Sequence, residues 1–192
     1  MGNNLPYPII VGVASIYLAP VGTAFPDTDE VPGAAWFDMG CTDDDGVTIE
    51  HIRNYKKHYK GCSTAVQKVT EESSAEEISF NLAEITPKRY ALLLGDAALT
   101  AVPAGSGTPG TEWFAIGPTE VPAQYACLIR GPSPLSDADA QYEYARVSVS
   151  DTVSVQYSKA DPSVLATKLE AFPDLDHPER FGIYRAQAAV AA

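Results

Sequence analysis

Short stretches in which apolar and polar residues alternate, each ended by proline or glycine, constrain this chain more than any other feature. The clearest stretch is Ile78, Phe80 and Leu82, with Ser79 and Asn81 between them. A spacing of two places the apolar and the polar side chains on opposite faces of a β-strand. The 192 residues also include 15 prolines and 14 glycines, which a fold built from long helices would not tolerate. The sequence therefore predicts a mainly β fold.

Other stretches with β-branched or alternating residues are expected to supply the remaining strands. A strand that begins at residue 47 should be followed by a turn at 61–63 and by a return strand. Two later strands are expected to form a hairpin about a tight turn at Ser150–Asp151. The expected strands are 11–18, 47–60, 65–70, 78–82, 111–117, 121–130, 142–150 and 152–158, and 163–172 is ambiguous between helix and strand.

One short helix is expected at about residues 87–94. Thr86 suits its N-cap, Pro87 its first turn and Gly95 the position after its end. Residues 1–192 are expected to form a single domain, a β-sandwich or partly closed barrel with this helix and long loops. The expected loops are an extended arm at 19–35 and a flexible loop at 103–110, and the small-residue tail at 186–192 is expected to fray.

Charged residues are separated into blocks along the chain. Residues 1–50 contain no Lys or Arg, whereas residues 51–70 contain no Asp or Glu. Blocks of opposite sign can pair within a subunit or between identical neighbours, although a solvated surface without a role is the alternative for any single charge. The candidate subunit-interface residues are Arg53, Lys56, Lys57, Lys60, Lys68, Asp43, Asp44, Asp45, Glu76 and Glu77.

Composition and motifs argue against several classes of function. A net charge of −12 does not favour binding to nucleic acid through its phosphates. The chain has no secretion signal and no stretch of about 20 apolar residues that would span a membrane. None of the common nucleotide, hydrolase or zinc motifs is present, and Asp43–Gly46 lacks the glutamate that would complete a calcium loop. The sequence predicts a structural protein without catalytic residues, cofactor or metal, and three reduced thiols at Cys41, Cys62 and Cys127.

The central segment, 40–95, resembles the major tail tube proteins of long-tailed, siphovirus-type bacteriophages. The matching pieces are Gly46-Val47, Thr70-Glu71, the strand at 78–84 and the helix region from Thr86 to Gly95. The order of the elements fits from residue 11 to about residue 184.

The resemblance implies a virion protein that forms rings of six subunits, which stack into a hollow tube for DNA delivery. Its partners would be further copies of itself and the tape-measure, tail-tip and terminator proteins, with assembly in the host cytoplasm and DNA passing through without specific binding. Each subunit would add strands to one inner barrel, and residues 19–35 and 53–68 would be arms that order on stacking.

One property departs from this family. Residues 47–70, which would correspond to strands lining the tube, are basic, whereas a DNA-conducting wall is expected to be acidic. Two alternatives stay open beside the tail tube. One is another ring-forming protein, such as a tail terminator or a type VI secretion tube subunit, and the other is a carbohydrate- or protein-binding β-sandwich that uses Trp36 and Trp113.

Overall fold

The computed structural model describes residues 12, 14–61, 64–95, 98–117, 122–135, 138–150, 152–155, 157, 159 and 162–187. These residues form a mainly β structure with one short helix, as expected. The elements are β1 (Ser15–Pro20), β2 (Phe37–Asp38), β3 (Thr42–Tyr59), β4 (Val66–Leu82), α1 (Pro87–Leu93), β5 (Thr100–Val102), β6 (Thr111–Trp113), β7 (Gln124–Pro132), β8 (Asp139–Val149), β9 (Ser154–Val155), β10 (Leu165–Ala171) and β11 (Ile183–Ala186).

One antiparallel sheet contains all the strands except β5 and β6, which form a separate hairpin. Its order is β2-β1-β7-β8-β10-β4-β3, with β11 added to β8 and β9 added to β10. On the edge of β8 that faces away from β7, β11 pairs with residues 140–143 and β10 with residues 147–149. The sheet therefore divides at β8 and folds over its own core. The arrangement is sandwich-like, and the described strands do not close into a barrel.

The main core lies between the two halves of this folded sheet. The alternation predicted at Ile78, Phe80 and Leu82 is confirmed, because all three side chains are buried. They pack in one cluster with residues of β1, β7, β8 and β10, including Leu169, whose side chain is fully buried. Burial of each such side chain contributes about 1.5–3 kcal/mol to folding.

A second layer covers the outer face of β1 and β7. Residues 21–36 run across this face, and Trp36 packs with Phe25 over Ala126 and Leu128. The indole Nε1 of Trp36 donates a hydrogen bond to the carbonyl oxygen of Ala24 at 3.2 Å. Because the loop covers them, the central strands are buried on both faces, which explains their nearly continuous apolar sequences.

Helix α1 follows β4 and covers one end of the core. Its predicted caps are confirmed: the hydroxyl of Thr86 accepts a hydrogen bond from the amide of Arg89, and Gly95 adopts a φ of 105° that favours glycine. The phenol of Tyr125 on β7 donates to the carbonyl oxygen of Leu92 at 2.8 Å. This bond fixes the helix to the central sheet.

The predicted hairpin about Ser150–Asp151 is wrong. Strand β9 pairs with β10, where Val155 lies opposite Leu165, and β8 pairs with the same strand, where Val149 lies opposite Leu169. Strands β8 and β9 thus run in the same direction along one edge of β10. Val149 and Val155 have the same parity in the sequence because both strands pair with β10, and not because a turn joins them as a hairpin. Residue 151 itself lies outside the described residues.

Other boundaries differ from the expectations. The strand expected at 11–18 begins at Ser15, the one at 111–117 ends at Trp113, and the ambiguous segment 163–172 forms β10. The loop at 103–110 connects β5 to β6. The expected strands 65–70 and 78–82 are parts of one long strand, β4. The tail at 188–192 lies outside the described residues.

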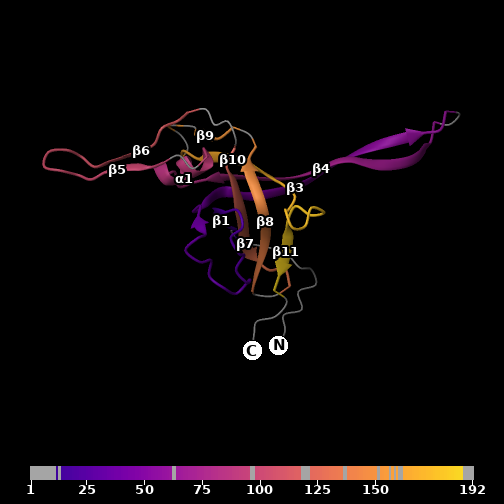
Figure 1. Cartoon of the computed structure of the whole chain (residues 1–192), viewed down its shortest axis with the longest axis horizontal. Coiled ribbons are helices and arrows are strands. Elements are labelled where there is room, and N and C mark those ends of the chain that lie inside the picture. Colours follow the sequence, from indigo (N-terminus) through magenta and orange to yellow (C-terminus); the bar gives the residue numbers. More distant parts are fainter. Residues whose placement is uncertain are drawn as a thin grey trace.

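Two hairpins project from the folded sheet in opposite directions. Figure 1 shows the long β3–β4 hairpin, in purple, extending far to the right of the sheet, while the β5–β6 hairpin extends to the left. Strand β3 has 18 residues and β4 has 17. Only the part of this ribbon next to the sheet packs on the core. The rest is available for contacts beyond the subunit.

Candidate assembly surfaces

The β3–β4 ribbon changes character along its length. Near the sheet, Val47 and Ile49 of β3 lie opposite Phe80 and Ile78 of β4, and these pairs pack on the core. Beyond this part, nearly every residue of both strands is exposed. We call residues 53–60 and 66–74 the arm. Because a two-stranded ribbon without a packed face is only marginally stable in water, the arm has a structural reason to contact another surface.

The arm exposes large apolar and aromatic side chains. Tyr55 and Tyr59 are 51% and 58% exposed, and Val69 and Val66 are 51% and 43% exposed. Tyr55 pairs with Glu71 and Tyr59 with Val66 across the ribbon. Along β3 the two tyrosines have the parity of the core residues Val47 and Ile49, so the core-facing side of the strand continues outward without a cover.

The predicted basic residues lie on this arm. Four of them are lysines: Lys56, Lys57, Lys60 and Lys68. Within the part of the chain that the structure describes, these lysines form no ion pair with an acidic side chain of the subunit. The pKa of Arg53 is raised by its hydrogen bond to Tyr55, by the charge of Tyr55 and by the carboxylate of Glu71. His58 and Thr70 are hydrogen-bonded at 2.8 Å, which links the two strands. The end of the arm is therefore cationic.

The predicted acidic residues Asp43–Asp45 lie at the opposite end of β3. They form a bulge between Thr42 and Val47, which Gly46 allows by adopting a φ of 70°. Asn81 donates a hydrogen bond to Asp43 Oδ2 at 2.7 Å, whereas Asp44 and Asp45 are exposed. At about 3.3 Å per residue, Asp44 and Lys57 are about 40 Å apart along the strand. The two blocks cannot pair within one subunit.

Glu76 and Glu77 are occupied within the subunit, at the base of the arm. Glu76 is hydrogen-bonded to His51 through Oε2 and accepts a bond from the phenol of Tyr144 at 2.9 Å through Oε1. Glu77 pairs with Lys168 at 2.6 Å. Burial, together with the charge and hydrogen bond of Glu76, raises the pKa of Tyr144. The ten predicted interface residues thus fall into three separate places, and their role at an interface stays a prediction.

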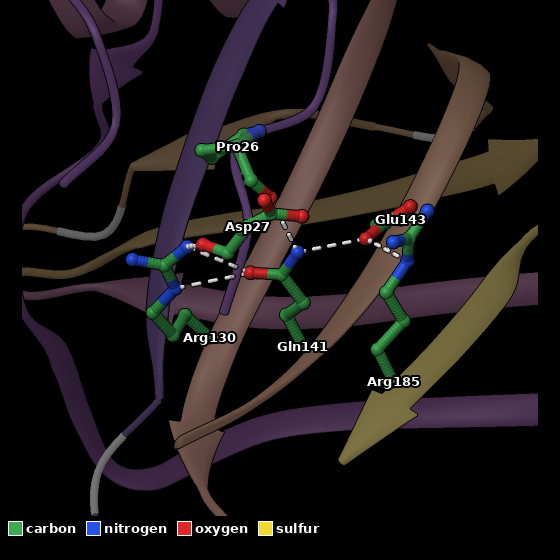
Figure 2. Close-up of polar contacts among 6 residues, drawn as sticks. All are labelled: Pro26, Asp27, Arg130, Gln141, Glu143 and Arg185. Atoms are coloured by element: carbon green, nitrogen blue, oxygen red, sulfur yellow. Dashed lines mark hydrogen bonds and ion pairs between the residues drawn. The ribbon is translucent and has the colours of Figure 1, made fainter. Parts of the chain in front are cut away.

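A buried polar network, missed by the sequence interpretation, attaches the 21–36 loop to the sheet. Gln141, fully buried on β8, donates hydrogen bonds to the carbonyl oxygen of Pro26 at 2.8 Å and to Glu143 at 2.7 Å. Arg130 donates to Gln141 Oε1 and also to the carbonyl oxygens of Asp27 and Glu30. Figure 2 shows these side chains meeting under the loop. The available signal was the alternation of Gln141 and Glu143 with Tyr142 and Tyr144 in the β8 sequence.

The same network reaches the last described strand. The carboxylate of Glu143 forms an ion pair with Arg185 of β11 at 2.8 Å, and the Glu143 side chain is 2% exposed. Figure 2 shows Arg185 approaching Glu143 from the side opposite the loop. One line of polar contacts therefore joins the loop, β7, β8 and β11. These contacts fix residues 26–30 to their own subunit. The expectation that residues 19–35 form a second arm that orders on stacking stays a prediction.

A further exposed surface lies on the β5–β6 hairpin. Trp113 is 55% exposed there, and Val102 and Ile116 are also exposed. Trp36, the other tryptophan considered for a sugar-binding platform, is buried under the 21–36 loop. Trp36 is therefore not available for such a platform.

The described residues were also compared with the requirements of other kinds of site. Among them, no group of three or more His, Cys, Asp or Glu side chains is arranged to hold a metal ion. No helix in the described part of the chain is long and apolar enough to cross a membrane. Burial raises the pKa of the Cys127 thiol to about 12, so it remains protonated at neutral pH. Cys41 is exposed, and Cys62 lies outside the described residues.

Comparison with known proteins gives one match over most of the chain. The family model described as phage tail tube protein matches residues 1–182. The match includes the arm, the acidic bulge and the central sheet. No curated protein matches the chain.

Proposed function

Because the chain belongs to the phage tail tube protein family, we propose that it self-assembles into stacked rings that form the tail tube of a siphovirus-type phage. The family is a structural one rather than a class of enzymes, and it implies a component of the virion tail. In the proposed function, subunits assemble in the host cytoplasm into rings of six. Tape-measure, tail-tip and terminator proteins set the length and ends of the tube.

The observation that carries this proposal is the arm. The arm exposes two tyrosines and two valines, and both faces of its two-stranded ribbon are open to solvent. Large exposed apolar side chains on a projecting element are typical of interaction surfaces. Contact with neighbouring copies would bury these side chains and stabilise the ribbon.

The edges of the sheet support a lateral contact between subunits. Strand β3 is the last strand of the sheet at one end, and the two-residue strand β2 is the last at the other. A long unpaired edge favours pairing with another chain unless it is protected. Head-to-tail pairing of different edges can close into a ring, which removes these edges. Rings stack when other contacts join each subunit to subunits of the next ring along the axis.

The charge of the subunit is consistent with conducting DNA. A net charge of −12 disfavours attachment to phosphates, so a wall formed mainly by acidic surface would let DNA slide. The cationic arm would disturb such a wall if it faced the lumen. We therefore place the arm against a neighbouring subunit in this proposal, away from the DNA.

Assembly is tested on the purified chain by negative-stain electron microscopy and by light scattering at rising concentration. We expect hollow tubes or stacked rings of uniform width, with a tail-tip or tape-measure seed added if the chain remains monomeric. In the matched variant, an Asn-Gly turn replaces residues 54–73, because Arg53 and Ser74 are paired and can flank a tight hairpin turn.

The variant should remain folded by circular dichroism and should not form tubes. A wild-type chain that stays monomeric with every seed would contradict the proposed function. Tubes of unchanged width from the shortened variant would show instead that the arm is not the assembly element. A monomer that binds a saccharide through Trp113 would favour the binding-module alternative.

A further inference from the structure

A groove of about 620 Å³ lies between the start of β3 and the strands β7 and β8. Its apolar lining comes from the buried core residue Ile129 and from partly buried residues, including Val47, Ile49, Pro132 and Tyr142. The acidic bulge Asp43–Asp45 forms part of its wall. The groove thus combines an apolar floor with a negatively charged side.

Two polar features of the groove have no partner in the described part of the subunit. The carboxylates of Asp44 and Asp45 are exposed and form no ion pair there. The hydroxyl of Thr42, which also lines the groove, is buried without a hydrogen-bond partner. A buried hydroxyl without a hydrogen-bond partner is destabilising, and Thr42 places one such group in the wall of the groove.

The arm has the complementary chemistry. Its outer part, residues 56–60 and 66–70, contains four lysines and no carboxylate. The same part exposes Tyr59, Val66 and Val69, which match the apolar floor. We propose that the groove beside Asp43–Asp45 receives the arm of a second copy of this chain. This inference rests on the proposed self-assembly and names the surface that the arm contacts.

The geometry requires the two partners to come from different subunits. The lysines and the acidic bulge are at opposite ends of β3, about 40 Å apart along the strand, so an arm cannot fold back into its own groove. Contact between opposite ends of identical subunits is heterologous and continues from copy to copy. The arm in its neighbour's groove is therefore a head-to-tail contact that joins each copy to the next in the assembly.

Other occupants fit the groove less well. DNA would be repelled by the aspartates. The β5–β6 region, residues 98–117, has Glu112 as its single charged residue and cannot neutralise them. Residues 1–11 contain no charged side chain and could match only the apolar floor. Among these candidates, the arm alone satisfies both the charge and the apolar surface.

The first experiment reverses charges on each side. D44K/D45K and K56D/K57D are each expected to slow tube growth at least about 10-fold, since like charges would then meet in the contact. The chain that carries all four substitutions should regain growth, because its arm and groove are again complementary. The matched controls E112K and K159D change exposed charges outside both surfaces and should grow like the wild type.

The second experiment locates the contact. In a C41S/C62S background, cysteines at positions 44 and 57 should form disulfides between subunits, which give a ladder of covalent oligomers on a denaturing gel. Each single-cysteine variant should give no ladder. Because Cys127 is buried, it does not interfere. The ladder also separates two explanations of the charge-reversal rescue. If growth depended only on the net charge of the chain, positions 44 and 57 would not meet and no ladder would form.

The outcomes separate this inference from the proposed function. The groove contact would be overturned, and the tube function would stand, if the wild type formed tubes while the chain with cysteines at positions 44 and 57 gave no ladder and D44K/D45K grew at the wild-type rate. A cysteine at position 9 that crosslinks to position 44 within one chain would assign the groove to residues 1–11 and also overturn it. Failure of the wild type to form tubes with any seed would remove both.

Discussion

The central sheet and the arm are built from the same kind of strand but have opposite environments. In β10, alternate residues from Leu165 to Ala171 are buried between two neighbouring strands. In the outer parts of β3 and β4, by contrast, nearly every residue is exposed. The sheet thus buries its core face inside the subunit, whereas a second molecule would cover the arm in the proposed assembly. Stability and assembly should therefore respond to different substitutions.

Truncation of the core should have the largest effect on subunit stability. Leu169→Ala removes a fully buried side chain from the main cluster and should lower the free energy of unfolding by about 3 kcal/mol. Val69→Ala on the arm and Leu175→Ala on an exposed loop should each change it by less than about 0.5 kcal/mol. Urea denaturation of the monomer measures all three. A large loss from Val69→Ala would mean that the arm is packed within the subunit.

The polar network beneath the 21–36 loop should have the next largest effect. Gln141→Leu would remove the hydrogen bonds that Gln141 forms with the Pro26 carbonyl and with the Arg130 guanidinium, and should cost about 2 kcal/mol. Hydrogen exchange in residues 24–31 should increase as the loop loosens. The same substitution at exposed Gln67 on the arm is the control and should leave both quantities unchanged. Unchanged exchange in Gln141→Leu would show that apolar packing of Trp36 alone fixes the loop.

The sequence alone could predict those parts of the fold in which local chemistry decides the structure. Thr86, Pro87 and Gly95 specify the ends of α1, and the spacing of Ile78, Phe80 and Leu82 identifies the buried face of β4. These signals depend on neighbouring residues and on one apolar face. They do not require knowledge of which strands pair.

Other features depend on long-range pairing and could not be read from the chain. Residues 71–77 are too polar to indicate a strand, yet they continue β4 because β3 pairs with them. The Ser150–Asp151 prediction failed for a related reason, since the common partner β10 lies later in the sequence. The acidic and basic blocks are close in sequence, but a straight strand separates them in space. Adjacency in sequence left a pairing within the subunit open, and for Asp43–Asp45 with the lysines of the arm the fold does not allow it.

The buried thiol should make the core sensitive to alkaline pH. Burial raises the pKa of Cys127 from 9.0 to about 12, so the folded state keeps a proton that the unfolded state releases above pH 9.0. The contribution of this thiol to the free energy of unfolding is thus fully present below pH 9.0 and is lost as the pH rises toward 12. At pH 10 the loss from this group should be on the order of 1 kcal/mol.

The measurement for this prediction is urea denaturation at pH 8 and pH 10, with Cys127→Ala as the comparison. The variant should be less stable at pH 8, because it loses buried volume, but its stability should fall less between the two pH values. Tyr144 contributes to both proteins in the same direction, because its pKa is raised mainly by burial and by Glu76, and its contribution largely cancels in the difference, since the charge of Cys127 is a smaller cause. Equal pH dependence in the two proteins would mean that Cys127 is accessible to solvent in the folded state.

Removal of the exposed tyrosines of the arm should have the smallest effect on the subunit. Tyr55→Ser with Tyr59→Ser removes rings that are about half exposed, so the free energy of unfolding should change by less than about 0.5 kcal/mol. Tube growth, followed by light scattering with seeds, should be strongly reduced, because these rings are buried only when a neighbour covers the arm. Tyr157→Ser is the matched control, since Tyr157 is 87% exposed and lies outside the arm. A double variant that grows like the control would place the apolar contact elsewhere, whereas one that unfolds easily would make the arm part of the subunit core.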